Sequence, residues 1–405
     1  MVLRVQKYGG TSVGDASRIR NVASRIAKAR EGGDQITVVV SAMGSTTNDL
    51  IALAGQVTAD PAPREMDLLL STGELVSCTL LAMALRKLNV PSVSLGGGQA
   101  GIRTNAAHGQ ASIIGVDPQR MHRELDQGRV VIVAGFQGIT EEMDVTTLGR
   151  GGSDTTAVAL AIALKADGCE VYTDVDGIFT ADPRVVPDAR KLDEIGYEEM
   201  LELASRGAKM HPRSIELGAR YKVPITVASS LHDGPGTLIH EVTTGMEVSN
   251  KVRGVTYEMG VSRITVRGVP DRPGIAAVLF ESLTDALISV DTIVQNASAE
   301  RLTDVSFTVD RADSPNALAL AREVAVQIGA AEVASDEHLG NVSIVGTGME
   351  NVPGYASRMF KTLYDEGINI EMITTSQIRI TCIVDEAKVH DAVRALHQTF
   401  ELDQA

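Results

Sequence analysis

The sequence predicts an α/β protein with a mostly parallel sheet sandwiched by helices, followed by two smaller α+β domains. Over the first 240 residues, strand-like apolar runs alternate with helical patterns, which is typical of a parallel sheet covered on both faces. The last third contains an internal repeat. At 405 residues the chain is too long for one core of ordinary size, so two or three domains are expected.

Composition narrows the function classes. The chain is 44% hydrophobic and 22% charged, as in soluble globular proteins. A net charge of −15 argues against a general binder of nucleic acid or anionic membranes. The three cysteines are far apart and lack metal-binding spacing, so free thiols are expected. The N-terminus lacks the apolar region of a signal peptide, and no apolar run approaches the roughly 20 residues of a membrane helix. We therefore expect a cytoplasmic protein.

The expected elements of the first part can be given in chain order. They are a strand at 3–9, a helix at about 15–30, a strand at 35–44, a helix near 71–88, strands at 90–96 and 129–138, a loop at 149–156 with the helix after it, and strands at 170–175 and 223–229. Ligands of such sheets bind at the carboxyl ends of the strands. The candidate residues lie at those ends.

The loop GRGGSDTT at 149–156 is the strongest local signal. Its three glycines allow backbone N–H groups to approach an anion, and the apolar helix after it begins with a partial positive charge. The alternative is a loop that only caps a buried helix, because Ser153, Asp154 and Thr155 are good N-cap types. Capping requires neither Arg150 nor a glycine run, so a phosphate site is favoured.

Other strand ends carry weaker signals. Lys7 with Gly9 and Gly10 offers a charge and N–H donors to a phosphoryl group, although a tight turn beside a surface lysine looks the same. The segment 41–49 is rich in hydroxyls and could be an ordinary capped loop. We expect Glu74 in the first turn of its helix, where the helix dipole alone explains an acid.

The remaining motifs indicate phosphoryl transfer without a P-loop. The segment GAKMHP at 207–212 places a second lysine, Lys209, near a helix start, and we interpret His211 as structural. The GxGxxG at 96–101 lacks a helix after it, and no GxxxxGK[ST] is present. Two lysines and the acids Asp154, Asp174 and Asp182 would suit Mg-ATP, because such catalysis consists of positioning and electrostatics. Arg150 could bind a carboxylate in a bidentate manner.

Taken in order, these motifs resemble those of the aspartokinases, in the amino-acid kinase family, over essentially the whole chain. The matching segments are KYGGTSV, VVVSAMGSTTNDL, STGE, GRGGSDTTA, YTDVDGIFTADPR and GAKMHP. The resemblance implies transfer of the ATP γ-phosphoryl group to the β-carboxylate of L-aspartate, as the first step of lysine, threonine and methionine biosynthesis. It also implies a kinase domain at 1–240, a linker at 241–260, and regulatory domains at 261–338 and 339–405. Mg²⁺ is inferred from the chemistry of phosphoryl transfer from ATP.

The resemblance also implies roles for individual residues. Lys7 would stabilise the transferring phosphoryl group and Asp154 would orient that lysine. Glu74 would receive the substrate ammonium, which replaces the helix-dipole explanation. The substrate residues would be Thr47, Glu74, Arg150, Gly151 and Ser153, and the nucleotide residues Lys7, Tyr8, Gly9, Gly10, Ser41, Thr173, Asp174, Arg184 and Lys209. Tyr8 replaces a frequent phenylalanine, which puts nothing catalytic in doubt.

The last third repeats itself at an offset of 80 residues. Pro273-Gly274 recurs as Pro353-Gly354, and the segment DRPGIAAVLFESLTDALISVDTI is matched by ENVPGYASRMFKTLYDEGINIEMI. Each copy predicts the order strand, loop, helix, strand, strand. A duplicated unit of this kind could be only a dimerisation platform.

These copies resemble the paired ACT domains of aspartokinases, which bind end-product amino acids, commonly between subunits. The matching effector positions would be Asp271, Gly274, Ile275, Ala276, Asp291, Gln295, Asn369, Ile370, Thr375 and Ser376. Threonine, lysine or both fit as effectors, and each would favour a less active arrangement through its differential affinity. The resemblance further implies a homo-oligomer through these domains, with a separately translated regulatory chain beginning near Met246.

Two rival functions stay open at this point. An enzyme of the same fold could phosphorylate another acceptor, such as glutamate or an acylated glutamate, although the STGE segment and the repeats speak against it. A non-catalytic amino-acid sensor is the other rival, which the presence of Lys7, Asp154, Arg150 and Lys209 disfavours.

Overall fold

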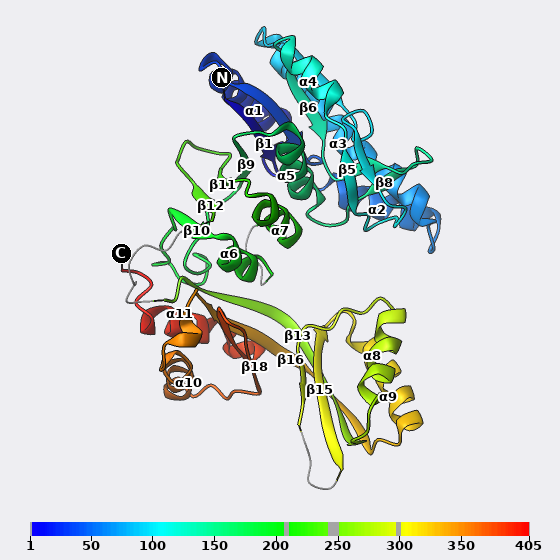
Figure 1. The fold of residues 1–405 in the computed structure, drawn as a ribbon, viewed down its shortest axis with the longest axis vertical. Coiled ribbons are helices and arrows are strands. Elements are labelled where there is room, and N and C mark those ends of the chain that lie inside the picture. The colour runs from blue at the N-terminus through cyan, green and yellow to red at the C-terminus, as the bar shows by residue number, and fades with distance from the viewer. Residues whose placement is uncertain (1, 206–209, 242–250, 297–300, 405) are drawn as a thin grey trace. The chain divides into compact units, whose positions relative to one another are not determined.

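The computed structural model describes residues 2–205, 210–241, 251–296 and 301–404. The chain forms two compact units (Figure 1). The first unit comprises residues 1–178 and 191–247, and the second comprises 179–190 and 248–405. The short segment 179–190, near the midpoint of the chain, thus belongs to the second unit although residues of the first unit flank it on both sides.

The first unit is built on an eight-stranded sheet in the order β10-β12-β11-β9-β1-β2-β6-β3. Its strands are β1 (Leu3–Tyr8), β2 (Gln35–Val40), β3 (Ser92–Leu95), β6 (Val130–Ala134), β9 (Gly168–Thr173), β10 (Glu194–Gly196), β11 (Ile225–Ser229) and β12 (Thr237–His240). Every pairing is parallel except that of β11 with β12. The predicted mostly parallel sheet is therefore confirmed.

Helices cover both faces of this sheet. They are α1 (Ala16–Glu31), α2 (Thr46–Val57), α3 (Pro63–Lys87), α4 (Gln119–Asp126), α5 (Gly152–Leu164), α6 (Tyr197–Ala204) and α7 (Pro212–Tyr221). Alternate residues of β2, Ile36 and Val38 among them, pack with α1 and α3. Val39 points to the opposite face of the sheet, where α5 begins. Successive side chains of a strand point to opposite faces, so this alternation is expected.

A smaller four-stranded sheet completes the first unit, in the order β5-β4-β7-β8. Its strands are β4 (Ile102–Thr104), β5 (Ile113–Val116), β7 (Gln137–Ile139) and β8 (Val145–Thr147). β8 runs directly into the glycine loop before α5, so this small sheet determines where that loop begins.

Helix α3 begins eight residues before the expected start near Ser71. The missed signal is Pro63, a residue that favours the first position of a helix. Glu74 consequently lies in the middle of α3, and the helix-dipole explanation for this acid was wrong. By length and hydropathy α3 is the one described helix that could cross a membrane. It packs against α1, β3, β6 and β8 and buries Asp67 and Glu74, which is typical of a core helix.

The second unit contains one six-stranded sheet in the order β14-β15-β13-β16-β18-β17. Its strands are β13 (Gly254–Pro270), β14 (Ile293–Gln295), β15 (Leu302–Asp310), β16 (Glu332–Val345), β17 (Met372–Thr375) and β18 (Arg379–Asp385). The long strands β13 and β16 pair from Gly254 with Val345 to Arg267 with Glu332. Because both strands run through both repeats, the repeats share one sheet.

Each repeat carries one helix more than the sequence predicted. The first has α8 (Ile275–Asp285) and α9 (Ser314–Ile328), and the second has α10 (Tyr355–Asp365) and α11 (Val389–Thr399), with short turns η1 (Met349–Asn351) and η2 (Glu386–Lys388). α8 packs with α9, and α10 packs with α11. The predicted repeat is confirmed, but its order ends in a helix.

The segment 179–190 enters the core of the second unit. Ala181, Val185 and Val186 are buried in the cluster formed by β13, β16, β18, α10 and α11. The Thr180 hydroxyl lies 2.9 Å from Nε2 of buried His397, and the Tyr257 hydroxyl donates to Asp182 at 3.2 Å. This segment is therefore an integral part of the repeat module.

Candidate active site

The loops after β1, β2 and β9 interlock at the carboxyl edge of the first sheet. The Gly9 N–H donates to the Tyr172 carbonyl at 3.2 Å, and the Gly44 N–H donates to the Gly10 carbonyl at 3.1 Å. A Cβ on Gly10 would lie 2.8 Å from the Ala42 carbonyl oxygen. The close approach of the two loops therefore requires glycine at this position.

Lys7 and Asp154 meet at this edge although they are far apart in the sequence. Lys7 Nζ lies 2.6 Å from Asp154 Oδ1, and the two side chains are only 12% and 10% exposed. Lys7 comes from the end of β1 and Asp154 from the first turn of α5. The structure thus brings together the lysine expected to stabilise the phosphoryl group and the acid expected to orient that lysine, and both side chains are largely buried.

Helix α5 begins at a glycine in the left-handed region. Gly151 is its N-cap with φ 72° and no side-chain capping bond, and Gly149 has φ 79°. Ser153, Asp154 and Thr155 lie inside the first turn, so they are not the N-caps that the alternative interpretation required. The N–H groups of Gly152 and Asp154 donate to the carbonyls of Gly149 and Gly151 at 3.0 and 3.1 Å. The partial positive charge of a helix N-terminus without a side-chain cap still favours an anion there.

The side chains of His211 and Phe136 pack closely against this loop, and the sequence analysis predicted neither contact. A Cβ on Gly151 would lie 2.3 Å from His211 Cδ2, and a Cβ on Gly152 would lie 3.0 Å from Phe136 Cδ2. Burial lowers the pKa of His211, which favours its neutral form. Phe136 has φ 68°, an uncommon value for a bulky residue, and its N–H donates to the Thr156 hydroxyl at 3.1 Å. No local sequence signal distinguishes Phe136.

Glu74 presents a buried carboxylate to the loop after β2. It is 3% exposed, and its Oε1 accepts the Ala42 N–H at 3.1 Å. Its Oε2 is buried and has no hydrogen-bond partner in the part of the chain described. Burial raises the pKa of Glu74 to about 7. A buried carboxylate oxygen without a partner is costly, and a cationic ligand would satisfy it.

The other expected substrate residues differ in how exposed they are. Arg150 is exposed, Thr47 is half-buried in α2, and Ser153 is buried. A Cβ on Gly135 would lie 2.8 Å from Ser153 Oγ, which places that hydroxyl at the end of β6. Among the described residues, no ion pair involves Arg150, so its guanidinium is available to an anion.

The expected nucleotide residues are only partly brought together. The ring of Tyr8 is fully buried and stacks on Tyr172 at 4.9 Å, so only its backbone could contact a ligand. Thr173 donates to Asp174 at 3.1 Å at the end of β9. Arg184 pairs with Asp182 at 2.6 Å within the second unit. Lys209 lies outside the described residues, as does Met246.

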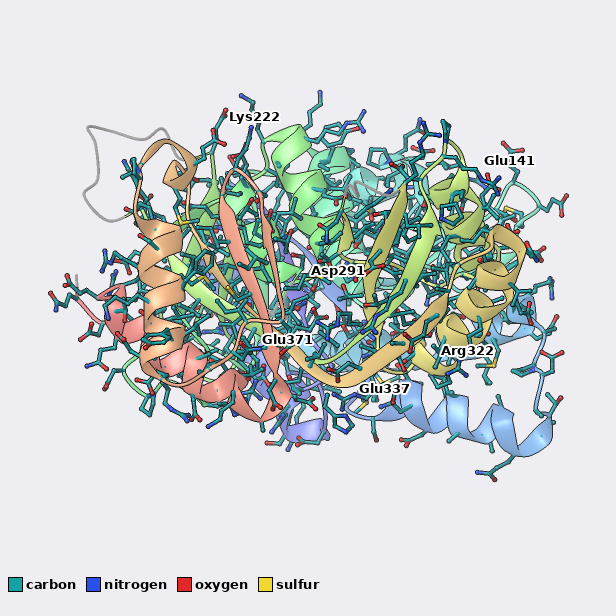
Figure 2. The ribbon with its side chains drawn as sticks, turned by 90° about the horizontal axis from the view of Figure 1, so that it is seen from below. Glu141, Lys222, Asp291, Arg322, Glu337 and Glu371 are labelled. Atoms are coloured by element: carbon teal, nitrogen blue, oxygen red, sulfur yellow. The ribbon has the colours of Figure 1, made fainter. Side chains whose placement is uncertain are left out.

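In the second unit, a cavity of about 340 Å³ opens at the start of α8. Five expected effector residues line it, namely Asp271, Gly274, Ile275, Ala276 and Gln295. Gly274 is the N-cap of α8, and Gly354 occupies the same position before α10, each with positive φ. The repeat-equivalent acids Asp291 and Glu371 precede the edge strands β14 and β17 (Figure 2).

The remaining effector positions lie near these edge strands. Asn369 Nδ2 donates to Glu371 at 2.8 Å, and the Ser376 N–H donates to the Arg379 carbonyl at 2.8 Å. Thr375 is the last residue of β17, and Ile370 is half-buried against the core of the second repeat.

Comparisons with known proteins agree with both units. The profile of the Amino acid kinase family matches residues 3–229, and the ACT domain profile matches 264–323 and 342–400. An aspartate kinase of Stutzerimonas stutzeri is 51% identical over 100% of this chain and 98% of its own length. An aspartokinase of Corynebacterium glutamicum is 47% identical over 99% of this chain and 97% of its own length.

Solved structures give the same result. E. coli aspartokinase III in complex with aspartate and ADP, described as an R-state, is 27% identical with a TM-score of 0.82, covering 98% of this chain and 99% of that one. The same enzyme in complex with lysine and aspartate, described as a T-state, is 28% identical with a TM-score of 0.77, covering 98% and 99%.

Proposed function

The chain belongs to the amino acid kinase family, in its aspartokinase branch with paired ACT domains, and from this we propose that it phosphorylates the β-carboxylate of L-aspartate with ATP. The observation that carries the proposal is the Lys7–Asp154 pair at the N-terminus of α5. Phosphoryl transfer needs positive charge in a site sheltered from water, and Lys7 together with the N-terminus of α5 would supply it.

The reaction moves one phosphoryl group. A β-carboxylate oxygen of aspartate attacks the γ-phosphorus, the bond from that phosphorus to the bridging oxygen breaks, and ADP leaves with the electron pair. The products are ADP and 4-phospho-L-aspartate. The Lys7 ammonium offsets charge on the transferring oxygens, and Asp154 holds that ammonium in place. The N–H groups of the Gly151 loop orient the phosphates.

The acceptor is recognised as an amino acid. Glu74, with its buried unpartnered Oε2, would receive the α-ammonium, and exposed Arg150 would bind the α-carboxylate as a fork. Thr47, Gly151 and Ser153 would lie beside the substrate. The expected nucleotide residues Lys7, Tyr8, Gly9, Gly10, Ser41, Thr173, Asp174, Arg184 and Lys209 remain part of the proposal.

Magnesium would enter with ATP. Among the described residues, no group of three or more His, Cys, Asp or Glu side chains is arranged to hold a metal. Mg²⁺ is commonly held by one or two carboxylates together with substrate phosphates, and Asp154 and Asp174 are acids of the kind required. The ion would offset phosphate charge when bound.

Regulation is the second half of the proposal. The cavity at the start of α8 would take threonine, lysine or both, with Asp271 as the counterion of an ammonium group. The lysine complex of E. coli aspartokinase III supports an amino acid as the effector class. We retain as proposals the division into 1–240, 241–260, 261–338 and 339–405, a homo-oligomer through the ACT domains, a regulatory chain from Met246, and a cytoplasmic location.

The test is coupled ADP release from Mg-ATP with L-aspartate or L-glutamate, each with and without millimolar threonine or lysine. Aspartate-dependent turnover suppressed by an effector supports both halves of the proposal. Turnover that no effector changes would return the repeats to a dimerisation role. Turnover with glutamate alone, or none with aspartate, would overturn the proposed substrate.

A further inference from the structure

Helix α3 carries a second buried acid that the proposed mechanism does not use. Asp67 is 1% exposed and lies two helical turns before Glu74 on the same buried face, since residues i and i+7 share one side of a helix. Its carboxylate accepts hydrogen bonds from three different residues. A buried carboxylate with that many donors is strongly localised.

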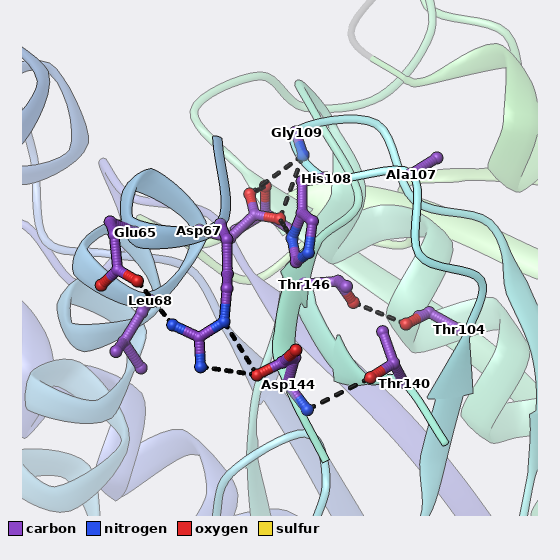
Figure 3. A network of polar contacts seen from close by, with 12 residues as sticks. Glu65, Asp67, Leu68, Thr104, Ala107, His108, Gly109, Thr140, Asp144 and Thr146 are labelled. Atoms are coloured by element: carbon purple, nitrogen blue, oxygen red, sulfur yellow. Dashed lines mark hydrogen bonds and ion pairs between the residues drawn. The ribbon is translucent and has the colours of Figure 1, made fainter. Parts of the chain in front are cut away.

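Two of the donor residues, His108 and Gly109, lie in the loop between β4 and β5 (Figure 3). The third, Thr147, is the last residue of β8. His108 Nδ1 lies 2.8 Å from Asp67 Oδ2, and the Gly109 N–H lies 3.0 Å from both carboxylate oxygens. The Thr147 hydroxyl donates to Asp67 Oδ1. Asp67 therefore ties the loop between β4 and β5 to the last residue of β8, two residues before Gly149.

The β4–β5 loop is in turn packed against the glycine loop. A Cβ on Gly149 would lie 3.1 Å from the Gly109 carbonyl oxygen, and the Ala111 N–H donates to the Thr147 carbonyl at 2.9 Å. Arg213 of α7 bridges the two segments, since it donates to the Leu148 carbonyl at 2.8 Å and to the Ala111 carbonyl at 3.0 Å. The start of the Gly149 loop is thus held between α3 and α7.

We propose that Asp67 is a positioning residue for acceptor binding, which acts through Gly109 and Thr147 to hold the Gly149–Arg150 turn at a fixed distance from Glu74. This inference rests on the proposed function. α3 carries Glu74 directly and fixes the Arg150 loop through Asp67, so one rigid helix sets the spacing between the expected ammonium and carboxylate sites. Of the expected nucleotide residues at the ends of β1 and β9, Lys7 pairs with Asp154 and Thr173 bonds to Asp174, and neither takes part in the described hydrogen bonds of this network.

The experiment uses the full chain and separates the two substrates. Asp67→Asn removes the charge but keeps one acceptor, and we expect KM for aspartate to rise about tenfold while KM for ATP changes less than about twofold, because misplacement of a binding group costs the ligand that it contacts. Thr147→Val, which keeps shape and loses the hydroxyl, should raise KM for aspartate severalfold, and Thr147→Ser should restore it.

Controls distinguish positioning from a general loss of structure. Glu124 is a buried acid of the same unit that pairs with Arg129 at 2.6 Å, and Glu124→Gln should lower the melting temperature without changing either KM. Equal changes in both KM values, or a fall in kcat alone, would overturn the inference. So would equal behaviour of Thr147→Val and Thr147→Ser, which decides the matter if Asp67→Asn does not fold.

The turnover of aspartate by the wild-type protein distinguishes a failure of this inference from a failure of the proposed function on which it rests. No aspartate turnover by the wild type would contradict the proposed function itself. Normal wild-type turnover with an unchanged aspartate KM in Asp67→Asn and Thr147→Val would contradict only the role of Asp67.

Discussion

Two helices of this molecule begin in the same way and in opposite surroundings. α5 in the first unit and α8 in the second both start at a glycine with positive φ and without a side-chain cap. A Cβ on Gly151 would strike the ring of His211, whereas a Cβ on Gly274 would meet nothing within 4 Å. The first helix end is suited to hold one geometry, and the second is suited to admit a ligand.

The acids at the starts of α5 and α8 also differ in how far they are buried and paired. At α5 the acid Asp154 is already paired with Lys7 in a nearly dry site. At α8 Asp271 is exposed and lines an open cavity. Electrostatic interactions are stronger where water is excluded, so the same motif can serve chemistry in one place and reversible binding in the other.

The largest expected effect is at the start of α5, where Gly151 is packed against His211 (the crowded end). Lys7→Met should lower kcat about 10³-fold, because it removes the cation aimed at the transferring group. Coupled ADP release measures this, and calorimetric binding of threonine or lysine should be unchanged. Lys361→Met is the control, because Lys361 is an exposed lysine that pairs with Asp365. Near-normal turnover by Lys7→Met would refute the assignment.

Gly151→Ala should come next. The added methyl group meets His211 at 2.3 Å, so the loop must shift, and a shift of about 1 Å at a catalytic group costs about 10²-fold in rate. We expect this loss in kcat/KM with a folded protein by circular dichroism. Retained activity would mean that the crowding against His211 does not fix the loop.

Glu74 makes the crowded end sensitive to pH. Its pKa is raised to about 7, so below that pH the free site is neutral and binds an ammonium poorly. The kcat/KM for aspartate should fall about tenfold per pH unit below pH 7 and level off above it. Glu74→Gln should be weakly active with a flat profile in this range. A wild-type profile without that slope would argue against the ammonium role.

The same raised pKa predicts that the free energy of unfolding falls as pH rises, whereas activity rises. The unfolded chain releases this proton near pH 4.5, whereas the folded chain keeps it until about pH 7, so burial of Glu74 destabilises the fold increasingly across that interval. Glu74→Gln should therefore gain stability relative to the wild type as pH rises from 4.5 to 7. Denaturant titrations at the two ends of the interval measure the difference.

The smallest effect is expected at the open end. In Gly274→Ala the added Cβ would contact no atom within 4 Å, and the positive φ of this residue would lower the stability of the protein by only about 1 kcal/mol. Turnover without effector should therefore be unchanged. The effector concentration that halves activity should rise severalfold. Gly354→Ala is the matched change in the second repeat, where the added Cβ is equally free. A fall in basal turnover for Gly274→Ala would break the contrast between the two helix ends.

Local patterns were sufficient for most of the fold. The apolar runs predicted six strands of the large sheet, namely β1, β2, β3, β6, β9 and β11, whereas the short strands β10 and β12 and the four-stranded sheet were not predicted. The fixed offset of 80 residues predicted the shared architecture of the repeats. The missed helices α9 and α11 were partly signalled, since α9 begins at Asp313-Ser314-Pro315 and ends at Gly329, which are ordinary start and stop residues. The start of α3 was missed for a similar reason at Pro63.

The sequence singled out candidate site residues where one motif supplies both the residue and an expected role, and those roles stay predictions. Lys7, Glu74 and Asp154 stand in such motifs, and the structure places Lys7 in contact with Asp154. Phe136, Asp67 and His211 act by packing or bonding to residues distant in sequence, and no period or spacing records those contacts. The membership of 179–190 in the second unit is of the same kind, because it depends on which core its apolar residues fill.

That excursion determines how the two units are joined. The polypeptide crosses between them at 178/179, 190/191 and 247/248, so three covalent tethers connect them where an ordinary linker would provide one. A fragment cut near residue 240 would keep Ala181, Val185 and Val186 without the core that buries them. The catalytic half is thus expected to be a poor stand-alone expression product, and swapping regulatory modules between relatives would require exchanging 179–190 as well.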